Sequence, residues 1–207
     1  MMIGKPWAAL LLLLLQGTGS GWSPGQAAEE QRTERFDRDP GWEGRNNRSA
    51  TPEPRSVRQD FGYSRTGHAG GAVGEIGGFI SPAAEPSYYA RKIPAAGLDG
   101  VVAASGTMAV DPEGQPGGNT LIGFFNADTV NEWRTPNSIV LRINGRGDGF
   151  HVHLEYATAL WRAGGDFFSA PPDAKGRRPL RLIPGGPKTH SWSLAYDPRA
   201  NDGGGAV

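Results

Sequence analysis

The chain has 207 residues, no cysteine, and equal numbers of acidic and basic side chains, so its formal net charge is zero. Without cysteine the fold cannot rely on disulfide bonds, and its stability must come from a buried core or from a bound ion. Neutrality gives no sign of the basic face that nucleic-acid binding requires, so we expect no nucleic-acid partner. Arginine far outnumbers lysine, and glycine and alanine are abundant, which is typical of GC-rich bacterial genes.

Residues 1–28 have the pattern of a secretory signal peptide. Lys5 precedes an apolar run over residues 7–15, and small residues follow up to Ala27 and Ala28, where cleavage is expected. The run is shorter than the about 20 apolar residues that a transmembrane helix needs, and no later segment reaches that length. We therefore expect a secreted or periplasmic protein without a transmembrane segment.

Residues 29–55 form a polar segment rich in Arg, Glu, Asp and Pro. Such a segment buries too little apolar area to offset its ordering entropy alone, so it is expected to be a linker or an arm. Phe36 and Trp42 are its aromatic residues, and we favour an arm that docks on the main body through them.

Residues 56–207 show a succession of short strands separated by Gly- and Pro-rich turns, with no amphipathic helix of three turns. Regular short strands with polar turns are typical of an all-β sandwich or barrel. The expected strands are 57–63, 74–80, 88–93, 101–110, 120–126, 138–144, 150–158 and 191–196.

The clearest local prediction is a hairpin that joins residues 138–144 to residues 150–158. Ile139, Leu141 and Ile143 fall on one face of the first strand because side chains alternate along a strand. In the partner strand, the apolar even-numbered positions oppose a second face that carries polar side chains. One face is therefore expected to be core and the other polar.

The end of the chain repeats this alternation over residues 190–196. Asp197-Pro198 stops the strand, a glycine-rich turn follows, and Ala206-Val207 resembles the start of a returning strand. We therefore expect a sheet that is truncated at the C-terminus, and a chain that aggregates or is marginally stable when expressed as written.

The hairpin over residues 137–156 and the closing stretch over residues 190–198 resemble the concanavalin A-like lectin/glucanase superfamily, in particular the laminin G-like domains of secreted bacterial proteins. The closing stretch is similar to the family's pattern of His, Trp, aliphatic and Tyr-Asp before a glycine turn. The resemblance implies an antiparallel jelly-roll β-sandwich that binds a glycan or polysaccharide, often with calcium nearby.

Laminarinase-type hydrolases of this superfamily carry a motif of Glu, an aliphatic residue, Asp, two further residues and Glu. The nearest segment here is residues 75–80, which has Gly77 in place of the Asp and Ile80 in place of the second Glu. The catalytic pair of the family is thus absent, and its activity is not carried over.

The expected ligand-binding residues combine aromatic rings with polar side chains, because ring faces stack on apolar faces of a ligand while Arg, Asn and His bond its hydroxyls. His151 and His153 share a face with Glu155, and this set could also chelate a metal, with His190 as a further ligand if its strand lies near. The full set expected to bind the ligand is Asn126, Trp133, Arg134, Arg142, His151, His153 and Trp161. For Trp192 we favour a place in the core.

Weaker candidates exist for catalysis and for calcium. Glu75 and Glu155 are the strand-borne carboxylates that could act as an acid and base pair, although Glu75 could instead bond loop amides. Asp197, Asn201 and Asp202 could offer oxygen ligands to calcium, although such residues are also common turn formers. The sequence favours a non-catalytic carbohydrate-binding or cell-surface module, with a glycoside hydrolase or lyase and a structural envelope protein as alternatives.

Overall fold

The computed structural model describes residues 2–4, 32–48, 59–80, 87–97, 99–111, 119–129, 137–147, 149–158 and 165–207, with the side chains of residues 2–4 left out. These residues form antiparallel sheets with almost no helix, as the sequence predicted. The helical pieces among them are a 3₁₀ turn, Ala127–Thr129, and the helix α1, Ala200–Gly203. In this described part, no helix has the length and apolar character needed to cross a membrane.

The first sheet has five strands in the order β11-β6-β1-β4-β3. Its longest pairing joins β11 to β6 in antiparallel register, so that Leu194 lies opposite Ala104 and Trp192 opposite Gly106. The strands are β1 (Met2–Gly4), β3 (Asp60–Ser64), β4 (Glu75–Phe79), β6 (Val102–Ala109) and β11 (Thr189–Tyr196).

The second sheet has four strands in the order β10-β9-β8-β7, and a two-stranded sheet pairs β2 with β5. The centre of the second sheet is the predicted hairpin, in which Leu141 lies opposite Leu154 and Ile143 opposite Val152. The strands are β2 (Glu43–Arg45), β5 (Tyr88–Ala90), β7 (Asn119–Phe125), β8 (Ser138–Arg146), β9 (Gly149–Ala157) and β10 (Ile183–Pro184).

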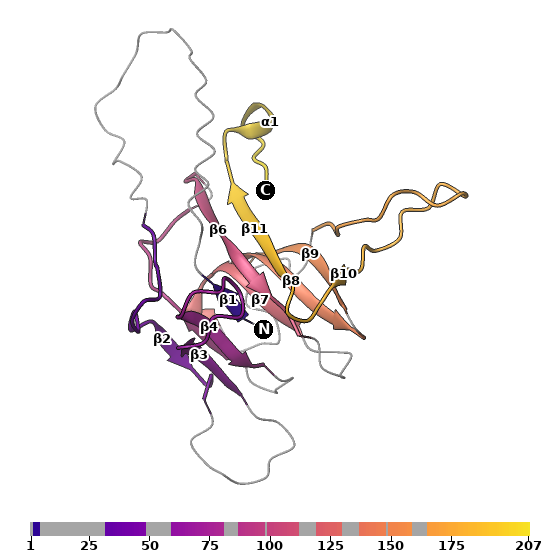
Figure 1. The fold of residues 1–207 in the computed structure, drawn as a ribbon. Coiled ribbons are helices and arrows are strands. Elements are labelled where there is room, and N and C mark those ends of the chain that lie inside the picture. The colour runs from indigo at the N-terminus through magenta and orange to yellow at the C-terminus, as the bar shows by residue number, and fades with distance from the viewer. Residues whose placement is uncertain are drawn as a thin grey trace, which may run out of the picture.

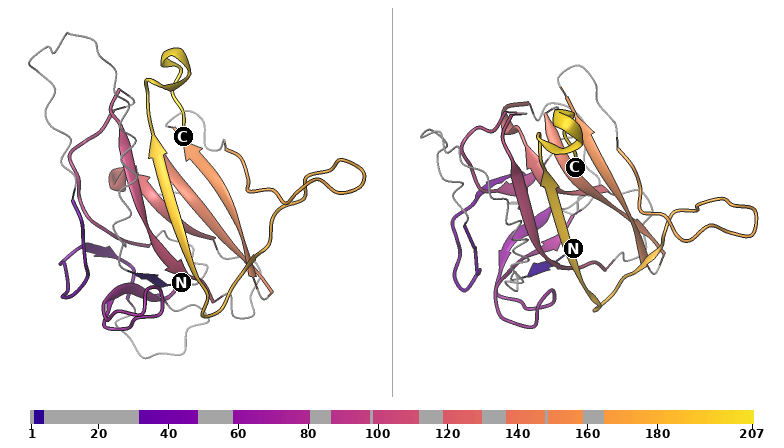
Figure 2. Two further views of the ribbon diagram at one scale, coloured as in Figure 1. Left: turned by 45° about the horizontal axis from the view of Figure 1, so that its top comes forward. Right: turned by 90° about the horizontal axis from the view of Figure 1, so that it is seen from above.

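One hydrophobic cluster draws on both larger sheets, and the β6–β11 pair lies across β8 and β9 in Figure 1 and in both views of Figure 2. Leu194 and Met108 come from the first sheet, and Trp192 packs against the cluster from the same side, as predicted. The predicted apolar face of the hairpin meets them. The buried members are Met108, Val110, Ile122, Leu141, Ile143, Phe150, Val152 and Leu194.

Every strand predicted from the sequence is present, with its ends shifted by a few residues. The short strands β1, β2 and β10 were not predicted, because three residues or fewer give too little alternation to recognise. β1 lies within the expected signal peptide and pairs with both β4 and β6, which do not otherwise pair with each other.

The arm docks through the two aromatic residues that the sequence singled out. Phe36 is buried at 5 % exposure, and its ring meets that of Trp42 edge-on with centroids 5.2 Å apart. Trp42 stacks in turn on Tyr89 of β5 at 5.8 Å. The Tyr89 hydroxyl donates to Asp39 at 3.2 Å, and burial together with this carboxylate raises the pKa of Tyr89 to about 12.

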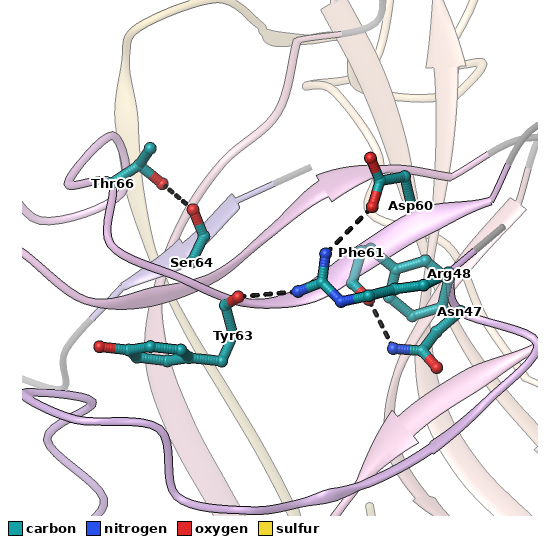
Figure 3. Close-up of polar contacts among 7 residues, drawn as sticks. All are labelled: Asn47, Arg48, Asp60, Phe61, Tyr63, Ser64 and Thr66. Carbon is teal, nitrogen blue, oxygen red and sulfur yellow. Dashed lines mark hydrogen bonds and ion pairs between the residues drawn. The ribbon is translucent and has the colours of Figure 1, made fainter. Parts of the chain in front are cut away.

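The arm ends against β3 (Figure 3). The Asn47 amide donates to the carbonyl of Phe61 at 2.6 Å, while Arg48 reaches the Asp60 carboxylate at 3.0 Å and the carbonyl of Tyr63 at 2.8 Å. These bonds hold the arm along the edge of the first sheet, so residues 32–48 are part of the folded body.

Candidate functional site

The polar face of the predicted hairpin lies opposite the hydrophobic cluster. In the register of the second sheet, His153 lies opposite Arg142 and His151 lies opposite Asn144. Residues directly opposite one another share a face, so these four side chains form one patch. We call the patch the outer strip and define it as Asn119, Leu121, Arg142, Asn144, His151, His153 and Phe167.

Arg142 and Glu155 form an ion pair in this face, with Nε 2.8 Å from Oε2. Their side chains are 24 % and 8 % exposed, so the pair is largely removed from water. Charge-assisted contacts strengthen where the dielectric falls, and each partner offsets the burial cost of the other. The pair holds the Arg142 side chain beside Glu155, within the face that carries the strip.

The two histidines of the outer strip are placed differently. His151 Nδ1 lies 3.1 Å from the carbonyl of Arg181 and must carry the proton there, since a carbonyl only accepts. In the neutral ring this leaves Nε2 as an acceptor. Burial, then Arg142, then His151 lower the pKa of His153 below its ordinary value of 6.5, against an opposing effect of Glu155, so its ring is neutral at pH 7.

Four members of the outer strip were not predicted. Asn144 donates to Asn119 at 2.9 Å, and this amide pair closes one end of the strip. Phe167, which is 42 % exposed, forms a bridge to His153 and holds its ring 6.4 Å from the imidazole. Leu121, at 40 % exposure, lies opposite Arg142 on β7. The Phe167-Phe168 dipeptide was the signal available, but its pairing with β9 is non-local.

The opposite end of the same face is covered. Val140 is 2 % exposed and Glu155 6 %, and Tyr88 of β5 packs edge-on against Phe125 at 5.4 Å. The accessible part of the face therefore runs from His153 towards Asn119 and Asn144. An arginine, imidazoles, amides and one exposed phenyl ring can together bond hydroxyl groups and contact an apolar ring face.

His190 does not join the histidines of the outer strip, so the expectation that it could add a metal ligand there is wrong. Its ring packs edge-on against Phe150 at 5.5 Å, and its Nε2 lies 2.9 Å from the carbonyl of Pro184. Phe150 belongs to the hydrophobic cluster, whereas the neighbouring His151 points to the other face. The even spacing along β11 places His190 on the core side with Trp192.

Glu75 has the structural role that the sequence offered as the alternative to catalysis. Its carboxylate is fully buried, accepts a bond from the backbone N–H of Ala69 at 2.9 Å and bonds the hydroxyl of Thr66. These bonds fix the turn between β3 and β4. Glu75 belongs to the first sheet and Glu155 to the second.

The candidate calcium ligands lie in the C-terminal turn. The Asp197 carboxylate accepts from the backbone N–H of Arg199 at 2.9 Å, and this bond, followed by the Arg199 side chain, lowers the pKa of Asp197. Asn201 donates to the carbonyl of Gly205 at 3.0 Å, and both Asn201 and Asp202 adopt left-handed backbone angles. Asp197 also pairs with Ala206, so the turn does return the chain as predicted.

Across the described ranges, no three His, Asp or Glu side chains gather closely enough to hold a metal ion. Asn126 accepts from the backbone N–H of Asp128 at 2.9 Å and so begins the 3₁₀ turn. The predicted contacts Trp133, Arg134 and Trp161 lie outside the described residues.

The chain matches no family model, no curated protein and no solved structure.

Proposed function

We propose that the chain is an exported, non-catalytic module that binds a glycan on the outer strip, carried by a β-sandwich of the concanavalin A-like, jelly-roll kind. The observation that carries the proposal is the strip itself, where fixed donors and acceptors stand beside an exposed phenyl ring. Sugars present both hydroxyl groups and apolar ring faces, and this mixture of side chains complements both.

The placement of the carboxylates supports a binding module over a glycoside hydrolase. Hydrolysis of a glycosidic bond uses two carboxyl groups that flank it, at most about 10 Å apart. Glu75 is fully buried and bonded to a turn of the first sheet, and Glu155 is paired with Arg142 in the second. Each is engaged in holding the fold.

The test is a polysaccharide pull-down and glycan array with the mature protein, combined with an assay for released reducing sugar. We expect binding without release, and at least a tenfold weaker affinity for His153→Ala combined with Asn144→Ala. Ser193→Ala is the matched control, because Ser193 is exposed on β11 and lies far from the strip in the sheet order.

Trp133→Ala tests the contact predicted from the sequence alone. Sugar release that disappears in Glu155→Gln would replace the proposal with a hydrolase. Absence of both binding and release would favour a structural envelope protein.

A further inference from the structure

Residues 166–182 form a two-stranded ribbon that leaves the body beside β9 and projects from it in every view (Figures 1 and 2). Ala170 donates to the carbonyl of Pro179 and Arg181 to that of Phe168, each at 2.8 Å. Leu180 pairs with Ser169 between these bonds. The ribbon is thus a hydrogen-bonded element with a defined register, in a segment where the sequence had suggested only turns.

The base of the ribbon continues the outer strip. Because Ser169 lies opposite Leu180, these two side chains share one face of the ribbon with Phe167, which is two residues before Ser169. The Leu182 side chain lies against Gly149, the first residue of β9. Phe167 also lies against His153. Leu180 and Leu182 are 39 % and 49 % exposed, so an apolar surface runs from the strip onto the ribbon.

The outer part of the ribbon is basic in a chain that is neutral overall. Residues 173–181 contain four cations and a single carboxylate, Asp173. Asp173 bonds Arg177 Nε at 2.7 Å and accepts from the backbone N–H groups of Lys175 and Arg177. Its charge is therefore used within the turn, and no ion pair joins Lys175, Arg178 or Arg181 to any described residue.

We propose that the ribbon is the second half of the glycan site and that it selects a polyanionic polysaccharide, whose sugar rings lie along Phe167 and Leu180 while its acidic groups meet Lys175 and Arg178. This inference rests on the proposed function of the outer strip. From Phe167 to Asp173 an extended strand covers about 20 Å. The ligand is therefore a polymer, since one sugar cannot reach both ends.

The test compares polysaccharides of one backbone that differ only in charge: polygalacturonate against its fully methyl-esterified form, and dextran sulfate against dextran. The protein is the mature chain, and affinity is measured at low and high salt. We expect the acidic form of each pair to bind at least tenfold more tightly, with a preference that shrinks as salt screens exposed charges.

Charge-reversal variants test whether the cations of the ribbon cause the preference for acidic polymers. Lys175→Glu combined with Arg178→Glu should weaken binding of the acidic polymers about tenfold and leave the neutral polymers unchanged, because exposed ion pairs add small increments each. Arg38→Glu combined with Arg65→Glu is the matched control, since both arginines are exposed and lie outside the ribbon.

The outcomes separate the two proposals. Equal binding of acidic and neutral forms, with loss only in the His153 and Asn144 variant, would overturn the role of the ribbon and keep the proposed function. If duplex DNA bound as tightly as the acidic polysaccharides, the role of the ribbon in selecting a polysaccharide would also be overturned, because the ribbon would then attract any polyanion. Failure of every glycan to bind would overturn both.

Discussion

At the scale of single residues, the Arg142–Glu155 pair gives the sharpest prediction. Replacing Glu155 with Gln leaves the guanidinium in a largely buried place without its counter-charge. We expect the free energy of unfolding to fall by about 3 kcal/mol, the lower end for breaking a buried pair, measured by urea denaturation.

The double variant Arg142→Met with Glu155→Leu is the matched control, because it removes both charges together. It should unfold within about 1 kcal/mol of the wild type. If the double variant lost as much free energy of unfolding as Glu155→Gln, then packing around the two side chains, and not their charge, would determine their effect on stability.

His153 gives a pH dependence with a definite sign. Burial and the neighbouring Arg142 lower the pKa of His153 in the folded state, so the unfolded chain binds the proton more tightly. Well above pH 6.5 the ring is neutral in both states, so His153 has no effect on the free energy of unfolding there. As the pH falls below 6.5, the unfolded state gains the proton first, and the folded state loses stability until the folded pKa is passed.

His153→Gln should remove this part of the acid sensitivity, which comparing the free energies of unfolding of both proteins between pH 8 and pH 5 would reveal. His68→Gln controls for the loss of one imidazole elsewhere on the exposed surface. An identical pH dependence in wild type and His153→Gln would contradict the assignment.

At the scale of elements, the docking of the arm depends on Gly74. This residue has a φ of 106°, and a Cβ there would collide with the backbone carbonyl of Phe36. Gly74→Ala should therefore release the arm, and trypsin should cleave after Arg35 and Arg38 much faster than in the wild type.

Gly71→Ala is the matched control for Gly74→Ala. Gly71 also has a positive φ, 72°, but a Cβ at this position meets no atom within 4 Å. Both variants carry backbone strain of about 1 kcal/mol, while only the first displaces Phe36. Equal trypsin sensitivity of the two would show that strain alone loosens the arm.

The elements also show what the sequence could predict. The alternation of apolar and polar residues over 138–157 identified two strands, their pairing and both faces. It could do so because successive side chains of a strand point to opposite faces. It thus placed Arg142, His151 and His153 together. The buried Phe36 and stacked Trp42 could be predicted because aromatic residues in a polar segment need a partner surface.

The ribbon and Phe167 could not be predicted in the same way. Residues 164–187 are rich in Gly and Pro, which indicates turns, and the pairing of this segment with β9 is decided by register between distant residues. The core-side position of His190 could have been predicted from the sequence. His190 shares a face with Trp192, because side chains alternate along a strand, and Trp192 was expected in the core.

At the scale of the whole molecule, β1 links two parts of the first sheet. Residues 1–28 were predicted to be a signal peptide, and a chain that starts at Glu29 would lack the strand between β4 and β6. The described buried members of the hydrophobic cluster all lie after residue 100, so we expect the mature chain to keep that part of the core.

Hydrogen exchange can check this, by comparing the full chain with a chain that starts at Glu29. Amides of β4 and β6 that face β1 should lose protection, while those of β8 and β9 keep it. Loss of protection throughout β8 and β9 would show that residues 1–28 stabilise the whole fold.

The ribbon also divides the covalent chain into two unequal pieces. Its exposed tip carries Lys175, Arg177 and Arg178, which makes it a natural place for tryptic nicking. The short piece that follows Arg177 would still hold β11, which pairs with β6 along its length and brings Leu194 into the core. A nicked molecule would therefore stay assembled as two fragments, and the short one could be exchanged for a synthetic peptide that completes the sheet from outside.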